Sequence, residues 1–142
     1  MSVTKFALLF KITLTFLWFI PLLLFPREWL IGLGMSASSV YEFVRLLGAA
    51  FLALLMGYVL GLRDLNKQIY PVNTILVGIA SNGLASLILF YFGITKGFNG
   101  WTGFGKWWMW ASAFLTLLVT ALLIAGLIIE ATNNRANPGS LR

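Results

Sequence analysis

The sequence predicts an all-α membrane protein: an antiparallel bundle of four transmembrane helices that forms one domain over residues 1–142. Four long apolar runs indicate this, because ~20 helical residues at ~1.5 Å each cover the ~30 Å hydrocarbon core of a bilayer. Apolar residues make up 60% of the chain and charged residues 10%, against roughly 25% charged in a soluble domain. We expect spans at about 6–25, 40–62, 72–93 and 107–129, and a polar tail at 131–142.

The first span, 6–25, carries one proline and one lysine. Pro21 has no backbone donor and is expected to kink the helix near its far end. Lys11 lies five residues inside the run. Its flexible stem can therefore reach back to the headgroups, and a lysine of an ion pathway is the alternative. We interpret the run as a retained span, because the small residues 36–38 lie too far beyond it for a signal-peptide cleavage site.

The connection 26–39 contains two glycines and a tryptophan among apolar neighbours, which predicts a segment lying in the membrane interface. Ser39 and Glu42 have the spacing of a capping box, so the second helix is expected to begin near Val40. Arg45 follows Glu42 by three positions, which predicts an ion pair on one helix face. An unpaired guanidinium at this depth would be costly.

The second span carries a stripe of small residues at every fourth position. Positions four apart share one helix face, and in lipid small side chains let two helix backbones approach closely. The stripe therefore predicts a helix-packing surface, and its spacing leaves open whether the partner helix belongs to this chain or to another. Its members are Ala49, Ala53, Gly57 and Gly61, with Gly48 beside them.

The third span, 72–93, has a similar stripe of small and polar residues. Asn82 lies near the centre of the bilayer, where lipid offers its amide no partner. We expect an interhelical hydrogen bond, worth about 1 kcal/mol, with a ligand contact as the alternative. The stripe consists of Gly78, Asn82 and Ser86, and the fourth span carries Ser112, Thr116 and Thr120 at the same spacing.

Tryptophans gather where the connection 94–106 enters the fourth span, and four of the six fall within ten residues. This clustering predicts an aromatic belt at one membrane face. The sharper interpretation is a site for a lipid or quinone headgroup. That site would be formed by Arg45, Trp107, Trp108 and Trp110.

Basic residues outnumber acidic ones, and the net charge is +6. In a membrane protein such residues flank the spans and meet anionic headgroups, so no nucleic-acid partner is expected. An even number of spans puts both termini on one side, with six basic residues on that side and four on the other. This bias predicts cytoplasmic termini. We expect an integral protein of the bacterial inner (cytoplasmic) membrane.

The chain has no cysteine and no histidine. This composition excludes disulfides, thiol catalysis, Ser-His-Asp triads and the usual zinc and haem ligands. The only acids are Glu28, Glu42, Asp64 and Glu130, which the predicted spans keep apart. We therefore expect no enzymatic activity, no catalytic residues, no cofactor and no metal site.

Residues 43–50, continuing through 56–58 to Arg63 and Asp64, resemble the second span of DoxX-like proteins, which are small bacterial four-helix membrane proteins. In that family an arginine and a glycine open the helix and a short polar turn closes it. The resemblance implies a four-helix bundle and, in some members, association with quinone-linked oxidoreductases. It makes Arg45 an arginine of the inner face and Gly48 a close-packing glycine.

Three functions remain open. The first is a non-catalytic subunit that packs within a larger membrane protein complex, since the chain has more stripes than a lone bundle needs. The second is a DoxX-like redox accessory protein associated with quinone or lipid. The third is a small transporter, although small multidrug transporters rely on a glutamate in their first span, where this chain offers only Lys11. The expected partners are other membrane protein subunits and membrane lipids or quinone.

Overall fold

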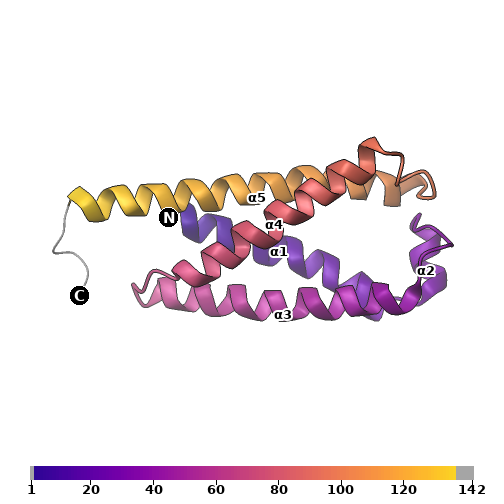
Figure 1. Ribbon diagram of the computed structural model, residues 1–142. Helices are drawn as coiled ribbons and strands as arrows, with labels where there is room; N and C mark the ends of the chain where they lie inside the picture. The colour runs from indigo at the N-terminus through magenta and orange to yellow at the C-terminus, as the bar shows by residue number, and fades with distance from the viewer. Residues whose placement is uncertain (1, 137–142) are drawn as a thin grey trace.

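The computed structural model describes residues 2–136 as five α-helices, and no strand occurs in that part of the chain. Four of the helices are long and apolar enough to cross a membrane. They run antiparallel (Figure 1), which confirms the predicted bundle of four transmembrane helices. The helices are α1 (Val3–Leu24), α2 (Arg27–Gly32), α3 (Tyr41–Asn66), α4 (Val72–Ile94) and α5 (Gly103–Ala136).

The long helices extend beyond the apolar runs that predicted them. The fourth run was expected to begin at Trp107, but α5 begins four residues earlier and continues through the polar residues 131–136. Hydropathy marks where a helix meets water, whereas the backbone hydrogen bonds continue past that point. The remainder of the predicted polar tail lies outside the described residues.

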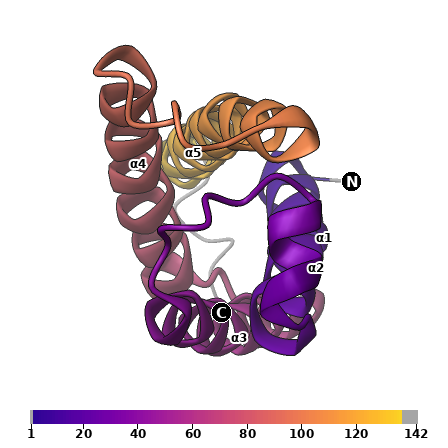
Figure 2. The same ribbon diagram turned by 90° about the vertical axis from the view of Figure 1, so that its right-hand side faces the viewer.

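The four long helices form a bundle with one open side. Helix α1 packs against both α3 and α5, and α4 packs against α5. In contrast, α4 leans away from α3 after the turn that joins them, so these two helices have little contact (Figures 1 and 2). The bundle is therefore closed on three sides.

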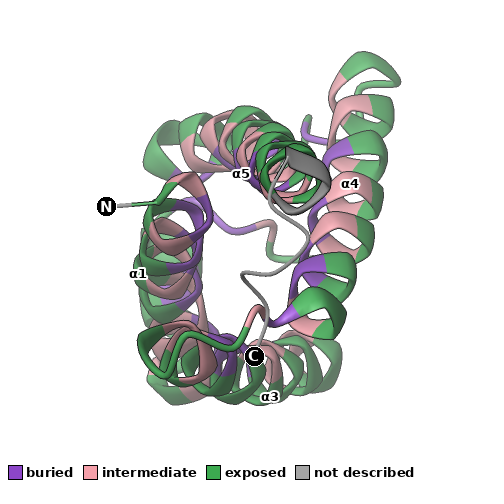
Figure 3. Ribbon diagram, turned by 90° about the vertical axis from the view of Figure 1, so that its left-hand side faces the viewer, coloured by how far each residue is buried: buried purple, intermediate pink, exposed green. Residues whose placement is uncertain are grey.

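The core is small and draws on every long helix. Its buried residues are Ala7, Leu8, Tyr58, Ile75, Val119 and Leu123. Many residues on the outside of the bundle are exposed (Figure 3), and a large share of them are large apolar side chains. In a membrane this surface needs no protein cover, because lipid tails are as apolar as leucine.

The segment between α1 and α3, predicted to lie in the interface, forms α2 and a turn that packs on the connection before α5. The backbone N–H of Thr102 donates to the Gly34 carbonyl at 3.0 Å. Gly34 has a φ of +102°, and a Cβ built on Gly105 would lie 2.7 Å from the Gly34 carbonyl carbon. Glycine is thus required on both sides of this contact. We call this end of the bundle the α2 end.

The capping box predicted for α3 does not form. The helix begins at Tyr41, within one residue of the predicted start, but its N-cap is Val40 and no side chain caps it. Ser39 therefore lies one position too early for its hydroxyl to accept the N–H that a capping box requires. The spacing of the motif was right, but its register relative to the helix was wrong.

Candidate functional site

Arg45 binds the carboxyl-terminal end of α1. Its guanidinium donates to the carbonyls of Leu22, Leu23 and Phe25, and to the hydroxyl of Tyr41. The Tyr41 hydroxyl also donates to Phe25 at 3.0 Å. The last carbonyls of a helix have no partner within the helix, and lipid supplies none. A cation here satisfies those carbonyls and opposes the negative end of the helix dipole.

The predicted Glu42–Arg45 ion pair is wrong. The donors of Arg45 face α1, and Glu42 is exposed. Among residues 2–133, whose side chains the structure describes, the only ion pair joins Arg63 and Asp64, at 3.9 Å on the surface. The guanidinium binds instead the carbonyls at the end of α1, which have no partner within the helix.

Gly48 lies where the backbones of α3 and α1 meet. A Cβ added there would lie 2.9 Å from the backbone nitrogen of Leu23 and 3.1 Å from the carbonyl carbon of Leu22. Gly48 follows Arg45 by almost one helical turn, so the close approach and the bound carbonyls belong to one contact. Gly61, at the other end of α3, is also buried, and its Cβ would meet the side chain of Thr74 at 2.6 Å.

The other members of the α3 stripe have no such cover. Ala49, Ala53 and Gly57 are exposed, and a Cβ added at Gly57 would meet no described atom within 4 Å. A groove of about 540 Å³ lies here between α3 and α4. It is lined by Ala50, Ala53, Leu54, Gly57, Tyr58, Asn73, Thr74 and Val77.

The α4 stripe faces the inside of the bundle, and Gly78, Asn82 and Ser86 are all buried. The Asn82 amide donates to the carbonyl of Gly78 in its own helix at 2.6 Å, and its Oδ1 has no hydrogen-bond partner among the described residues. The interhelical bond predicted for Asn82 is formed by its neighbour instead: the hydroxyls of Ser81 and Tyr58 lie 3.0 Å apart.

Lys11 was predicted to extend back to the headgroups, but it does not. Only 7% of the residue is exposed, and its Nζ lies 5.8 Å from the centre of the Tyr58 ring. Among the described residues no carboxylate pairs with it. Sequence position alone could not reveal this, since a lysine five residues inside an apolar run can turn either way.

The tryptophans predicted to form a headgroup site with Arg45 have different surroundings. Trp107 packs on Trp108 and is 61% exposed. Trp110 packs on Phe90 and Phe98 at the α4 side of α5. Arg45 is held at the end of α1, so the predicted set is distributed over three places.

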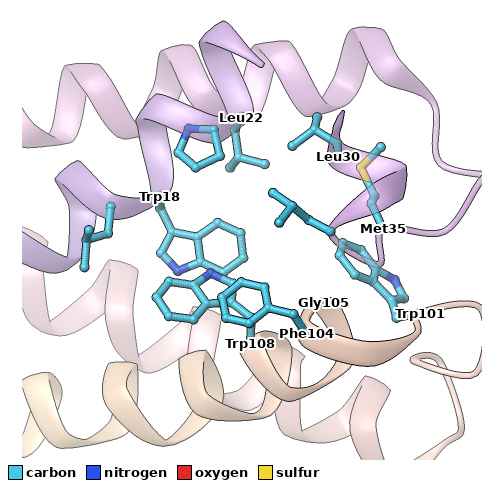
Figure 4. Close-up of a pocket in the computed structure, with 11 residues that line it drawn as sticks. Trp18, Leu22, Leu30, Met35, Trp101, Phe104, Gly105 and Trp108 are labelled. Carbon is cyan, nitrogen blue, oxygen red and sulfur yellow. The ribbon is translucent and has the colours of Figure 1, made fainter. Parts of the chain in front are cut away.

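Trp108 contributes instead to a cavity of about 230 Å³ at the α2 end (Figure 4). Its ring lies 5.7 Å from that of Trp18 in α1, whose Nε1 donates to Ser112 at 3.1 Å. Sequence reasoning missed Trp18, because it lies 90 residues away from Trp108 and only folding joins them. The cavity is lined by Leu17, Trp18, Pro21, Leu22, Leu30, Leu33, Met35, Trp101, Phe104, Gly105 and Trp108.

This cavity is suited to an apolar ligand. The cavity is partly open, so in a membrane an apolar molecule can enter it. Apolar cavities do not hold ordered water. A polar headgroup would lose its hydrogen bonds on entering, whereas an apolar chain or ring would lose none.

These features define a class, an α-helical bundle compatible with an integral membrane protein. No family model, curated protein or solved structure matches the chain. Among the described residues there is no cluster of three or more carboxylates that could hold a metal ion. The groove, the cavity and the contacts of α3 are therefore the features that bear on function.

Proposed function

We propose that this chain is a non-catalytic integral membrane subunit that packs within a larger complex by receiving a transmembrane helix of another subunit. The groove between α3 and α4 is the proposed contact. Gly57 carries the proposal, because no described part of the chain covers it: a Cβ added there would have no described atom within 4 Å.

The buried glycines of the bundle show what such residues do here. Gly48 and Gly78 each lie where a Cβ would come within 3 Å of a neighbouring helix. Helix association in lipid depends on this close packing, since lipid tails already satisfy apolar side chains. Ala53 and Gly57 present the same small surface on the open side of the bundle, where they line a groove that another helix could approach.

A retention experiment tests the proposal. Gly57→Leu should abolish copurification of a second membrane subunit after mild detergent extraction, because the added side chain projects into the groove. Ala121→Leu, a similar enlargement at an exposed site on α5, should retain the partner. Retention in both variants, or a wild-type protein that native mass spectrometry shows as a lone chain, would contradict the proposal.

The proposed orientation, with both termini cytoplasmic, has its own test. The chain contains no cysteine, so single cysteines report their side without any background. We expect a cysteine at Gln68 to react with an impermeant reagent only from the cytoplasmic side, and one at Asn99 only from the outside. The reverse pattern would invert the topology.

A further inference from the structure

We propose that the cavity at the α2 end holds one acyl chain of a membrane phospholipid. The proposal is independent of the groove and of any protein partner. It commits to a lipid chain because of the chemistry of the lining, the size of the cavity, the construction of its wall and the charges beside it.

The lining offers an occupant almost no polar partner. No lining residue carries a carboxylate, amide, hydroxyl or ammonium group. Its only side-chain donors are three indole N–H groups: that of Trp18 is already engaged by Ser112, which leaves those of Trp101 and Trp108. Because a buried polar group without a hydrogen bond is costly, a lining with so few donors favours a ligand whose inserted part is mainly hydrocarbon.

The volume limits how much of a ligand can enter. About 230 Å³ is below the ~300–1,000 Å³ of pockets that enclose whole drug-sized ligands. It exceeds the ~150 Å³ apolar cavity that binds benzene. A segment of one chain fits these limits, with the rest of the lipid outside.

The wall of the cavity is firmly built. The 3.0 Å hydrogen bond from Thr102 to Gly34 and the contact between Gly34 and Gly105 hold the α2 segment on α5. Leu30 and Met35, which line the cavity from this segment, are only 5% and 6% exposed. The wall cannot collapse into the cavity without breaking the glycine contact.

Two exposed cations belong to the segments that line the cavity. Lys106 is exposed and follows the lining residue Gly105 directly. Arg27 begins the short helix that supplies Leu30, and it is exposed with one guanidinium nitrogen bonded to the Ala37 carbonyl. Such residues at a membrane surface attract anionic headgroups, so a chain in the cavity places its phosphate near positive charge.

Native mass spectrometry of the full chain, after exchange into fresh detergent and addition of a phosphatidylglycerol of defined chain length, tests the proposal. We expect the wild type to retain one phospholipid. Leu33→Trp, which enlarges a lining side chain, should lose it. Ile31→Trp is the matched control, since it changes an exposed residue of the adjoining helix α2 that does not line the cavity, and it should keep the lipid.

Three outcomes would overturn the proposal: no lipid retained by the wild type, equal retention in Leu33→Trp, or a quinone retained in place of the added lipid. If Leu33→Trp does not fold, Leu30→Phe serves as the filling variant and should show the same loss. A brominated-chain phosphatidylglycerol gives a second readout. Bound in the cavity, it should quench tryptophan fluorescence in the wild type more than in Leu30→Phe, and equal quenching would count against the proposal.

Discussion

The two small-residue faces of α3 differ in whether another helix of the chain covers them. One face, at Gly48, lies against α1 so closely that a Cβ would come within 3 Å of its backbone. The other, at Ala53 and Gly57, lines an open groove toward α4. Both faces belong to one helix and have the same kind of residue, yet only one is covered within the chain.

The difference lies in what accompanies the small residue. Beside Gly48, Arg45 binds three carbonyls at the end of α1, so the close approach is fastened by polar contacts. Beside Gly57, the core residue Tyr58 reaches across to Ser81 of α4, but the rest of the two helices diverge. Small residues permit close packing in a membrane, and polar contacts determine which helix packs against them.

Removing the hydrogen bonds of Arg45 should have the largest effect on the free energy of unfolding. Arg45→Met keeps an unbranched side chain but removes every donor, so the partly buried carbonyls of Leu22, Leu23 and Phe25 lose partners. At ~1–3 kcal/mol for a buried group left unsatisfied, we expect a loss of about 3 kcal/mol in the free energy of unfolding. Thermal or denaturant unfolding in detergent measures it.

Arg45→Lys is the control for that variant and should recover part of the stability, because an ammonium can still bind some of the carbonyls. If Arg45→Met unfolds with the wild type, the arginine is an ordinary interface residue. Polar contacts would then not explain why only one of the two faces of α3 is covered.

Gly48→Leu should follow in size. The new side chain meets the backbone of α1 rather than a flexible side chain, so α3 must move away and the carbonyl contacts of Arg45 lengthen with it. Overpacking of this kind costs about 1–3 kcal/mol. Unfolding in detergent measures the loss, and an unchanged midpoint would show that α1 and α3 are less tightly joined than their distances indicate.

The sequence was sufficient to predict the spans but not their neighbours. Apolar runs located all four long helices, because their length is set by the bilayer. The fourfold spacing of Ala49, Ala53, Gly57 and Gly61 identified a face of α3. Spacing cannot distinguish Gly48 from Gly57, because the neighbour of each is determined by how four helices tilt.

The local polar contacts were the least predictable. Glu42 was expected to hold Arg45 because it lies three residues away, but the local partner of Arg45 is Tyr41 and its carbonyl partners are about 20 residues distant in the chain. The cavity likewise joins Trp18 to Trp108. Such contacts arise only when α1 ends beside α3 and α5, and no local pattern carries that information.

Lys11, which lies on the inner side of the groove, should destabilise the fold. It lies over Tyr58, which lines the groove, and no described carboxylate pairs with it. Because an unpaired buried charge is costly, Lys11→Met should raise the free energy of unfolding by about 1–2 kcal/mol. Lys5→Met, nearer the end of α1, is the control and should change little. A loss of stability in Lys11→Met would show that the ammonium has a partner that stabilises the fold.

The smallest effect on the isolated chain is expected at Gly57, and its sign should be opposite to that of Gly48. Gly57→Leu puts a side chain where no described atom lies within 4 Å of the Cβ, and it replaces a poor helix former inside α3. Helix propensity therefore predicts a gain of about 0.5 kcal/mol in the free energy of unfolding. Unfolding of the purified chain without its partner, measured beside Gly48→Leu, gives both signs in one experiment. A loss as large as that of Gly48→Leu would mean that α4 closes on α3 and that the two faces are alike. A gain, combined with loss of the copurifying subunit, would mean that the space beside Gly57 is kept for another helix.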